Sequence, residues 1–85
     1  MSKPILLVYM IAVEAISDSG RPIEDSVEID HPCTIEEAEE FTGKLRKLVQ
    51  RSYEEKRGGF LSIGDTVINL DKTVSVRLYV KRKPL

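Results

Sequence analysis

A run of nine consecutive apolar residues, from Ile5 to Val13, dominates the first part of the chain. The run is rich in β-branched and aromatic side chains, which favour a buried strand, and Ala15 and Ile16 extend it past Glu14. Both alternating faces are apolar as far as Glu14, so a strand here needs cover on both sides. We therefore predict a central strand with a helix on one face and a partner chain on the other.

The same run is too short to cross a membrane, because a spanning helix needs about 20 apolar residues. A secretory signal peptide is the closer alternative, since Lys3 precedes the run and the segment from Ala12 to Ala15 is similar to a cleavage site. Pro4 and the shortness of the apolar core argue against a signal peptide. We expect no membrane partner.

Turn-forming residues at 17–22 separate this strand from a second one. In the second strand Val27 and Ile29 alternate with Ser26, Glu28 and Asp30. Acidic side chains at these positions suit the edge of a sheet, because they discourage pairing with other chains. The two strands are predicted to form a hairpin.

One amphipathic helix is predicted over residues 35–57. Thr34 and Glu37 form a capping box at its start, and the two glycines at 58–59 end it. At 1.5 Å per residue this helix would be roughly 35 Å long, whereas a typical strand covers only about 17–20 Å. About a third of the helix, including Tyr53, would therefore overhang the sheet. The predicted apolar stripe consists of Ile35, Ala38, Phe41, Leu45, Leu48, Val49 and Ser52.

Three strands follow the helix, over residues 60–63, 66–70 and 73–83. Gly64 and Asp65 fit a two-residue type II′ turn between the first two strands, and Asp71 and Lys72 turn the chain into the last. The order is therefore β-β-α-β-β-β. We predict an α+β fold with a mainly antiparallel sheet of about five strands, one long helix on one face, and a single domain spanning 1–85.

Composition excludes several kinds of site. A single cysteine rules out an internal disulfide or a multi-cysteine zinc site, and a single histidine rules out a histidine-rich metal site. The glycines match neither the Walker pattern nor the dinucleotide pattern, and their places at a helix end and in a turn account for them. We expect no metal and no cofactor.

The charge is unevenly divided along the chain. Residues 1–43 hold two bases and ten acids, whereas residues 44–85 hold eleven bases and four acids. The net charge of −1 therefore conceals a sequence dipole. If folding separates the two halves in space, this dipole can orient self-association or attract a charged partner.

His31 and Cys33 are the only pair of residues that resembles a nucleophile and a base. They lie just before the helix, where a thiolate can be stabilised. However, no oxyanion arrangement accompanies them, and a metal site that includes Asp30 would lack a fourth ligand. We interpret both as structural loop residues and predict that the protein is not an enzyme.

The polar face of the last strand is a candidate binding site. It places Arg77, Tyr79 and Lys81 on one side, and interleaving a stacking ring with bases is typical of single-strand nucleic-acid binders. A solvated or partner-facing strand explains the same pattern, and the acidic half of the chain would repel a long polyanion. Nucleic acid or a small nucleotide is therefore the alternative ligand.

The segment from Gly59 to Lys72, followed by Val74 to Arg77, resembles hairpins in small accessory proteins of phages and prophages. The likeness covers about a quarter of the chain, its motifs are general hairpin patterns, and no catalytic motif can be carried over. The resemblance implies a non-enzymatic, homo-oligomeric and cytoplasmic protein that blocks a host enzyme or defence complex by binding it. If the protein is phage-encoded, the compartment is the host cytoplasm.

These observations predict a binding module that acts on another protein and associates with itself. The doubly apolar first strand, the single helix and the overhang each leave apolar surface that a second copy could cover. Nucleic-acid or nucleotide binding through the last strand remains the alternative function. The residues predicted to form the interface between copies are Leu6, Val8, Met10 and Tyr53.

Overall fold

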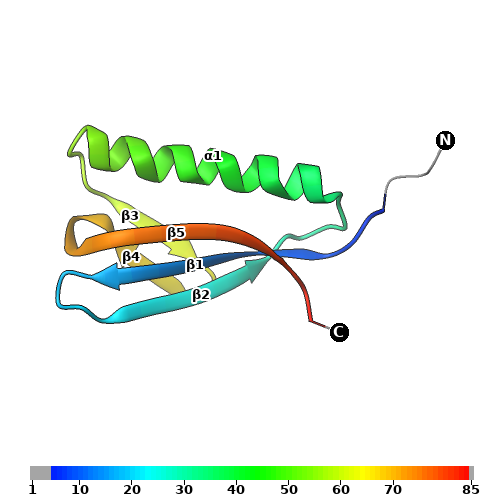
Figure 1. Ribbon diagram of the computed structural model, residues 1–85, viewed down its shortest axis with the longest axis horizontal. Coiled ribbons are helices and arrows are strands. Elements are labelled where there is room, and N and C mark those ends of the chain that lie inside the picture. Colours follow the sequence, from blue (N-terminus) through cyan, green and yellow to red (C-terminus); the bar gives the residue numbers. More distant parts are fainter. Residues whose placement is uncertain (1–4, 85) are drawn as a thin grey trace.

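Five strands and one long helix make up the computed structural model, which describes residues 5–84 (Figure 1). The predicted α+β class and the order of the elements are confirmed. Lys3 and Pro4, which bear on the signal-peptide alternative, lie outside the described residues. The elements are β1 (Tyr9–Ser17), β2 (Pro22–Glu28), α1 (Ile35–Glu54), β3 (Phe60–Ile63), β4 (Thr66–Asn69), a 3-10 turn η1 (Leu70–Lys72) and β5 (Thr73–Arg82).

The strands are antiparallel, as predicted, but they form two sheets. β1 lies between β2 and β5 in a three-stranded sheet, while β3 and β4 pair as a separate hairpin. After β4 the chain turns through η1, where the side chain of Asn69 accepts a hydrogen bond from the N–H of Asp71 at 3.0 Å. Apolar alternation defines the two faces of each strand but not its neighbours, so the division into three and two strands follows from long-range packing.

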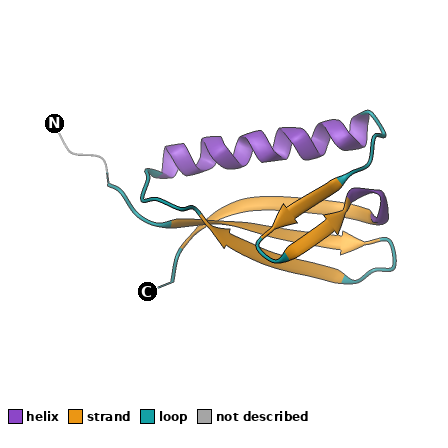
Figure 2. Cartoon of the chain, turned by 180° about the vertical axis from the view of Figure 1, so that it is seen from behind, coloured by secondary structure: helices purple, strands orange, loops and turns teal. Residues whose placement is uncertain are grey.

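α1 and the β3–β4 hairpin cover the same face of the three-stranded sheet, which we call the inner face (Figure 2). The helix runs along β5, and the hairpin lies behind the sheet in the view of Figure 1. The main core fills the space between these layers. Its buried members are Ile11, Val13, Ala15, Val49, Ile63, Ile68, Leu70 and Leu78.

The start of α1 is the predicted one. The N–H of Glu37 donates to Thr34 Oγ1 at 3.2 Å, and the N–H of Thr34 donates to Glu37 Oε1 at 3.3 Å, which completes the capping box.

The end of α1 differs from the prediction, because the helix stops at Glu54 and not at Arg57. Lys56 takes a left-handed conformation, with φ of 51°, and the N–H of Arg57 reaches back to the carbonyl of Ser52 at 3.1 Å. This Schellman-type end requires a left-handed residue, which is usually glycine. The chain uses Lys56 instead, two residues before the glycines that were expected to end the helix.

The buried face of α1 is also rotated from the predicted stripe. Ala38, Thr42 and Val49 are buried, whereas Phe41 and Leu48 are 56% and 60% exposed. Thr42 can face the core because its hydroxyl donates to the carbonyl of Ala38 at 2.9 Å, which leaves no unpaired polar atom. Small side chains at 38 and 42 bring the helix close to the sheet, so the larger Phe41 and Leu48 are left outside.

The β3–β4 hairpin is fixed to β2 through its turn. Gly64 has a φ of +60°, as the predicted type II′ turn requires, and a Cβ there would lie 2.9 Å from the carbonyl oxygen of Ser26. The Asp25 carboxylate accepts hydrogen bonds from the hydroxyl of Thr66 and, at 2.7 Å, from the N–H of Ser26. These bonds lower the pKa of Asp25 below its ordinary value of 3.8.

Candidate functional site

The outer side of the three-stranded sheet carries neither the helix nor the hairpin (Figure 1). Because strand side chains alternate, every second residue of β1, β2 and β5 points to this side, which we call the open face. The carbonyl of Val8 accepts the N–H of Lys83 at 3.1 Å, so the pairing continues just beyond the strand ends. The open face consists of Leu6, Val8, Met10, Ala12, Glu14, Ile16, Pro22, Glu24, Ser26, Glu28, Ser75, Arg77, Tyr79, Lys81 and Lys83.

The open face has an acidic side and a basic side. β2 contributes Glu24 and Glu28, and β5 contributes Arg77 and Lys81. These strands come from oppositely charged halves of the chain and lie on either side of β1. The sequence dipole is therefore also a dipole across the sheet.

The register places these charges at matching heights. Glu24 and Arg77 both lie beside Glu14, and Glu28 and Lys81 both lie beside Met10. Each acidic position of β2 on the open face thus has a basic position on β5 at the same level, with β1 between them. This symmetry depends on the two registers together, so alternation within one strand could not reveal it.

A polar network occupies the middle of the open face. The hydroxyl of Tyr79 donates to Glu14 Oε1 at 3.2 Å, and Arg77 Nη1 lies 3.6 Å from Glu14 Oε2. The Arg77 guanidinium also lies 5.1 Å from the centre of the Tyr79 ring, within cation–π range. Partial burial and the bond to Glu14 raise the pKa of the Tyr79 hydroxyl.

A second ion pair joins the two outer strands across β1. Lys83 Nζ lies 2.9 Å from Glu28 Oε2, and their registers put this pair beside Val8 and Met10. Both of those apolar side chains are half-buried, and Ala12 beside Tyr79 is only 2% exposed. Long polar side chains therefore cover part of the apolar surface that the sequence assigned to a partner chain.

The structure brings together three of the four predicted interface residues. Leu6, Val8 and Met10 follow one another on the open face, and Leu6 is the most exposed of them, at 56%. Tyr53 lies apart from them near the end of α1, where its hydroxyl bonds to Thr73 Oγ1 at the start of β5. Because α1 ends at Glu54, Tyr53 fastens the helix to the sheet rather than overhanging it.

The apolar end of the open face continues into a groove of about 420 Å³. This groove lies where β1 begins, and its lining combines apolar side chains with two cations. It is lined by Leu6, Leu7, Val8, Pro32, Arg82, Lys83 and Pro84.

The alternative nucleic-acid site also lies on the open face. Arg77, Tyr79 and Lys81 share one side of β5, as the alternation predicts. However, Arg77 approaches the Tyr79 ring and pairs with Glu14, so part of the stacking surface and one cation are already engaged. The acidic side chains of β2 stand on the same face, an arrangement that disfavours a polyanion.

His31 and Cys33 both line a cavity of about 210 Å³ near the start of α1, but each has its contacts elsewhere. The Cys33 side chain is 3% exposed, and its backbone pairs with that of Leu7. His31 Nδ1 instead lies 2.7 Å from Asp30 Oδ1 at the surface. Within residues 5–84, no three His, Cys, Asp or Glu side chains gather closely enough to hold a metal ion.

Sequence reasoning identified the basic half of the open face but missed its acidic half. Glu24 and Glu28 occupy alternate positions of β2, and Glu14 is the single charge in β1, so the alternation was visible. What was not visible is that the two outer strands lie on opposite sides of β1.

Comparison of the chain with models of known families, with curated proteins and with solved structures finds no match. Across the part of the chain that the structure describes, no helix combines the length and apolarity needed to cross a membrane. Function is therefore inferred from the geometry of this chain.

Proposed function

We propose that this protein is a non-enzymatic protein-binding module that associates with itself through the open face. The observation that supports this is the matched placement of Glu24 with Arg77 and of Glu28 with Lys81 on either side of β1. A face with this symmetry is complementary to a second copy of itself.

The symmetry selects one orientation for the second copy. In the favoured orientation the two open faces stack on each other, with a two-fold axis between them that runs parallel to β1. This axis places β2 of one copy over β5 of the other and leaves each residue at the same position along the strand direction. Glu24 then faces Arg77 of the partner subunit, and Glu28 faces Lys81 of the partner subunit. A two-fold axis across the strands would instead oppose β2 with β2, which brings like charges together.

Apolar side chains of β1 lie along this axis. Met10 and Ile16, with Val8 and Leu6 at one end, would meet their counterparts. Glu14 would also meet its counterpart, with its charge offset by Arg77 of its own chain. Three strands of seven to ten residues, spaced by about 4.8 Å, give a flat footprint of only roughly 400 Å². A standard interface buries about 800 Å² on each partner, so we expect weak association in the micromolar range.

The target of the module is a second protein. The resemblance of the C-terminal hairpins to phage accessory proteins favours a host enzyme or defence complex as that target, and the host cytoplasm as the compartment. Binding of nucleic acid receives less support, because the open face carries three acids among its bases.

Sedimentation equilibrium between 10 and 500 μM, on the order of the expected dissociation constant, tests the self-association. The mass should rise from 9.6 kDa toward twice that value as concentration increases. Lys81→Glu or Glu28→Lys alone should weaken association roughly tenfold, because each puts two like-charge pairs into the dimer. The double variant, which exchanges the charges, should associate like the parent.

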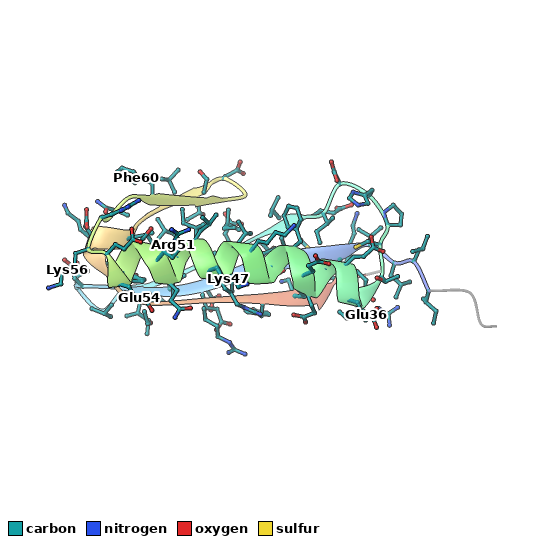
Figure 3. All side chains as sticks on the ribbon, turned by 90° about the horizontal axis from the view of Figure 1, so that it is seen from above. Glu36, Lys47, Arg51, Glu54, Lys56 and Phe60 are labelled. Carbon is teal, nitrogen blue, oxygen red and sulfur yellow. The ribbon has the colours of Figure 1, made fainter. Side chains whose placement is uncertain are left out.

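Lys47→Glu is the matched control, because it reverses one charge on the exposed side of α1 (Figure 3). It should leave the association unchanged. A parent chain that stays at 9.6 kDa throughout, or a double variant as weak as the single ones, would contradict the proposed interface.

A further inference from the structure

The two edges of the three-stranded sheet differ in their capacity to accept another strand. At the β2 edge, Pro22 has no N–H, and the N–H of Ser26 already bonds to Asp25 Oδ1 at 2.7 Å. The turn at Gly64 also lies against the carbonyl of Ser26. This edge is closed by the chain's own groups, as edge strands commonly are.

The β5 edge differs from the β2 edge in whether its outward backbone groups are already bonded or covered. The N–H of Lys83 donates to the carbonyl of Val8, and the register continues along the strand. The backbone N–H and C=O groups of the odd-numbered residues of β5 therefore point toward β1. Val76, Leu78 and Val80 therefore direct their backbone groups outward. Among residues 5–84, no acceptor is found for the N–H of any of these three.

Within residues 5–84, the one hydrogen bond that α1 makes to this edge comes from a side chain. The carbonyl of Leu78 accepts a hydrogen bond from Arg46 Nε at 3.0 Å, so α1 reaches the edge through a group that can move away. A groove of about 170 Å³ lies beside it, on the inner side of the strand. It is lined by Arg46, Val49, Gln50, Tyr53, Val76 and Leu78.

We propose that the β5 edge binds an extended segment of a partner protein as a fourth, antiparallel strand, and that this segment alternates acidic and apolar residues. The inference rests on the proposed protein-binding role, but not on self-association. Strand addition supplies affinity through main-chain hydrogen bonds and specificity through alternate side chains.

Charge and polarity along β5 determine the alternation. On the open side, the added strand would lie beside Arg77 and Lys81, which favour acidic residues. On the inner side it would lie beside Val76, Leu78 and the groove, which favour apolar residues. An antiparallel pair is expected because its hydrogen bonds are the more stable.

A second copy of this chain is a poor occupant of the edge. Pairing β5 with β5 would bring together two strands that each carry Arg77, Lys81 and Arg82. Pairing β5 with β2 of a neighbour would meet the closed edge at Pro22 and Ser26. The favoured occupant is therefore a different chain.

The probe is an eight-residue peptide of alternating glutamate and valine, titrated into ¹⁵N-labelled full-length protein. We expect a dissociation constant of about 0.1–1 mM, typical of a short, flexible ligand. The amides of Val76, Leu78 and Val80 should shift and exchange more slowly, and the Arg46 side-chain Nε–H should shift as it leaves Leu78. No shift with about 5 mM peptide, or protection at Glu24 and Glu28 of β2, would overturn the proposal.

N-methylated peptides test the pairing itself. In an antiparallel fourth strand, the residues opposite Val76, Leu78 and Val80 share their inner face and direct their N–H groups at β5. Methylation of the valine amides should therefore abolish binding, whereas methylation of the glutamate amides should preserve it. The reverse result would refute the antiparallel pairing, and equal binding of both would refute strand addition.

Two protein variants separate this proposal from the proposed function. Lys81→Glu should weaken binding of the glutamate–valine peptide roughly fivefold, because it reverses a neighbouring charge. Glu28→Lys weakens self-association equally but lies on the other edge, so it should bind the peptide like the parent. Loss of peptide binding in Glu28→Lys would overturn the edge assignment, and a parent that binds peptide while remaining monomeric would contradict only the self-association.

Discussion

The β3–β4 hairpin is an integral part of the core, and Ile68 provides the most direct test of this. Its side chain is fully buried, at 0% exposure, against residues of the sheet and the helix. Ile68→Ala should lower the free energy of unfolding by about 2–5 kcal/mol, the usual range for a truncated core isoleucine. A chain of 85 residues has a stability of roughly 4–13 kcal/mol, so this change can remove most of it.

The conservative Ile68→Val keeps the measurement quantitative if the alanine variant does not fold. It should cost about 0.5–1.5 kcal/mol. Each kcal/mol should lower the melting temperature by roughly 4–8 °C in a domain of this size. Urea denaturation followed by circular dichroism gives the free energy, and a thermal melt checks it independently.

The neighbouring Val67 is the matched control, because it points away from the sheet and is 63% exposed. Val67→Thr keeps the β-branched shape and should change stability by less than about 0.5 kcal/mol. If Val67→Thr costs more than Ile68→Val, the hairpin is shifted by one residue and exposes its other face. If both variants melt like the parent, the hairpin does not pack on the sheet.

Three further predictions concern the helix and the hairpin anchor. Val49→Ala should cost about 1–2 kcal/mol of unfolding free energy by urea titration, and exposed Leu48→Ala less than about 0.5; the opposite order would contradict the buried face of α1. Lys56→Gly should raise the stability by about 1 kcal/mol in a thermal melt, since a left-handed conformation strains a non-glycine residue, and a lower melting temperature would contradict that conformation. Asp25 has a lowered pKa in the folded state, so its contribution is present above pH 3.8 and is lost as the pH falls below that value. The urea midpoint of Asp25→Asn should therefore lie below that of the parent at pH 7 and approach it toward pH 2, whereas a gap that persists in acid would exclude the carboxylate as the cause.

Features that depend on neighbours in sequence could be predicted from the sequence. The capping box of Thr34 and Glu37, the turn at Gly64 and the alternation along β5 each involve residues within a few positions of one another. Their conformations are fixed by local hydrogen bonds and by steric limits on the backbone. The element order and the basic side of the open face followed from these patterns.

The tertiary structure decided which of several equivalent local patterns became buried. A helical wheel shows an apolar stripe through Phe41 and Leu48, but the close approach permitted by Ala38 and Thr42 turned those two residues outward. Likewise, the left-handed residue that follows the helix is Lys56, although two glycines lie further on, at positions 58 and 59. In both cases, packing against the sheet selected one among several conformations that the local sequence tolerated.

The open face is the clearest case of a feature that required the fold. Its acidic and basic residues lie more than 40 positions apart in the chain, and β2 and β5 are not paired with each other in the sheet. The insertion of β1 between β2 and β5, with two registers that align at Glu14 and Met10, created the matched charges. Strand order and register are set by burial of the inner face, which depends on residues far apart in the chain. The sequence therefore determined which residues carry charge, and the tertiary structure determined which of them lie at matching positions.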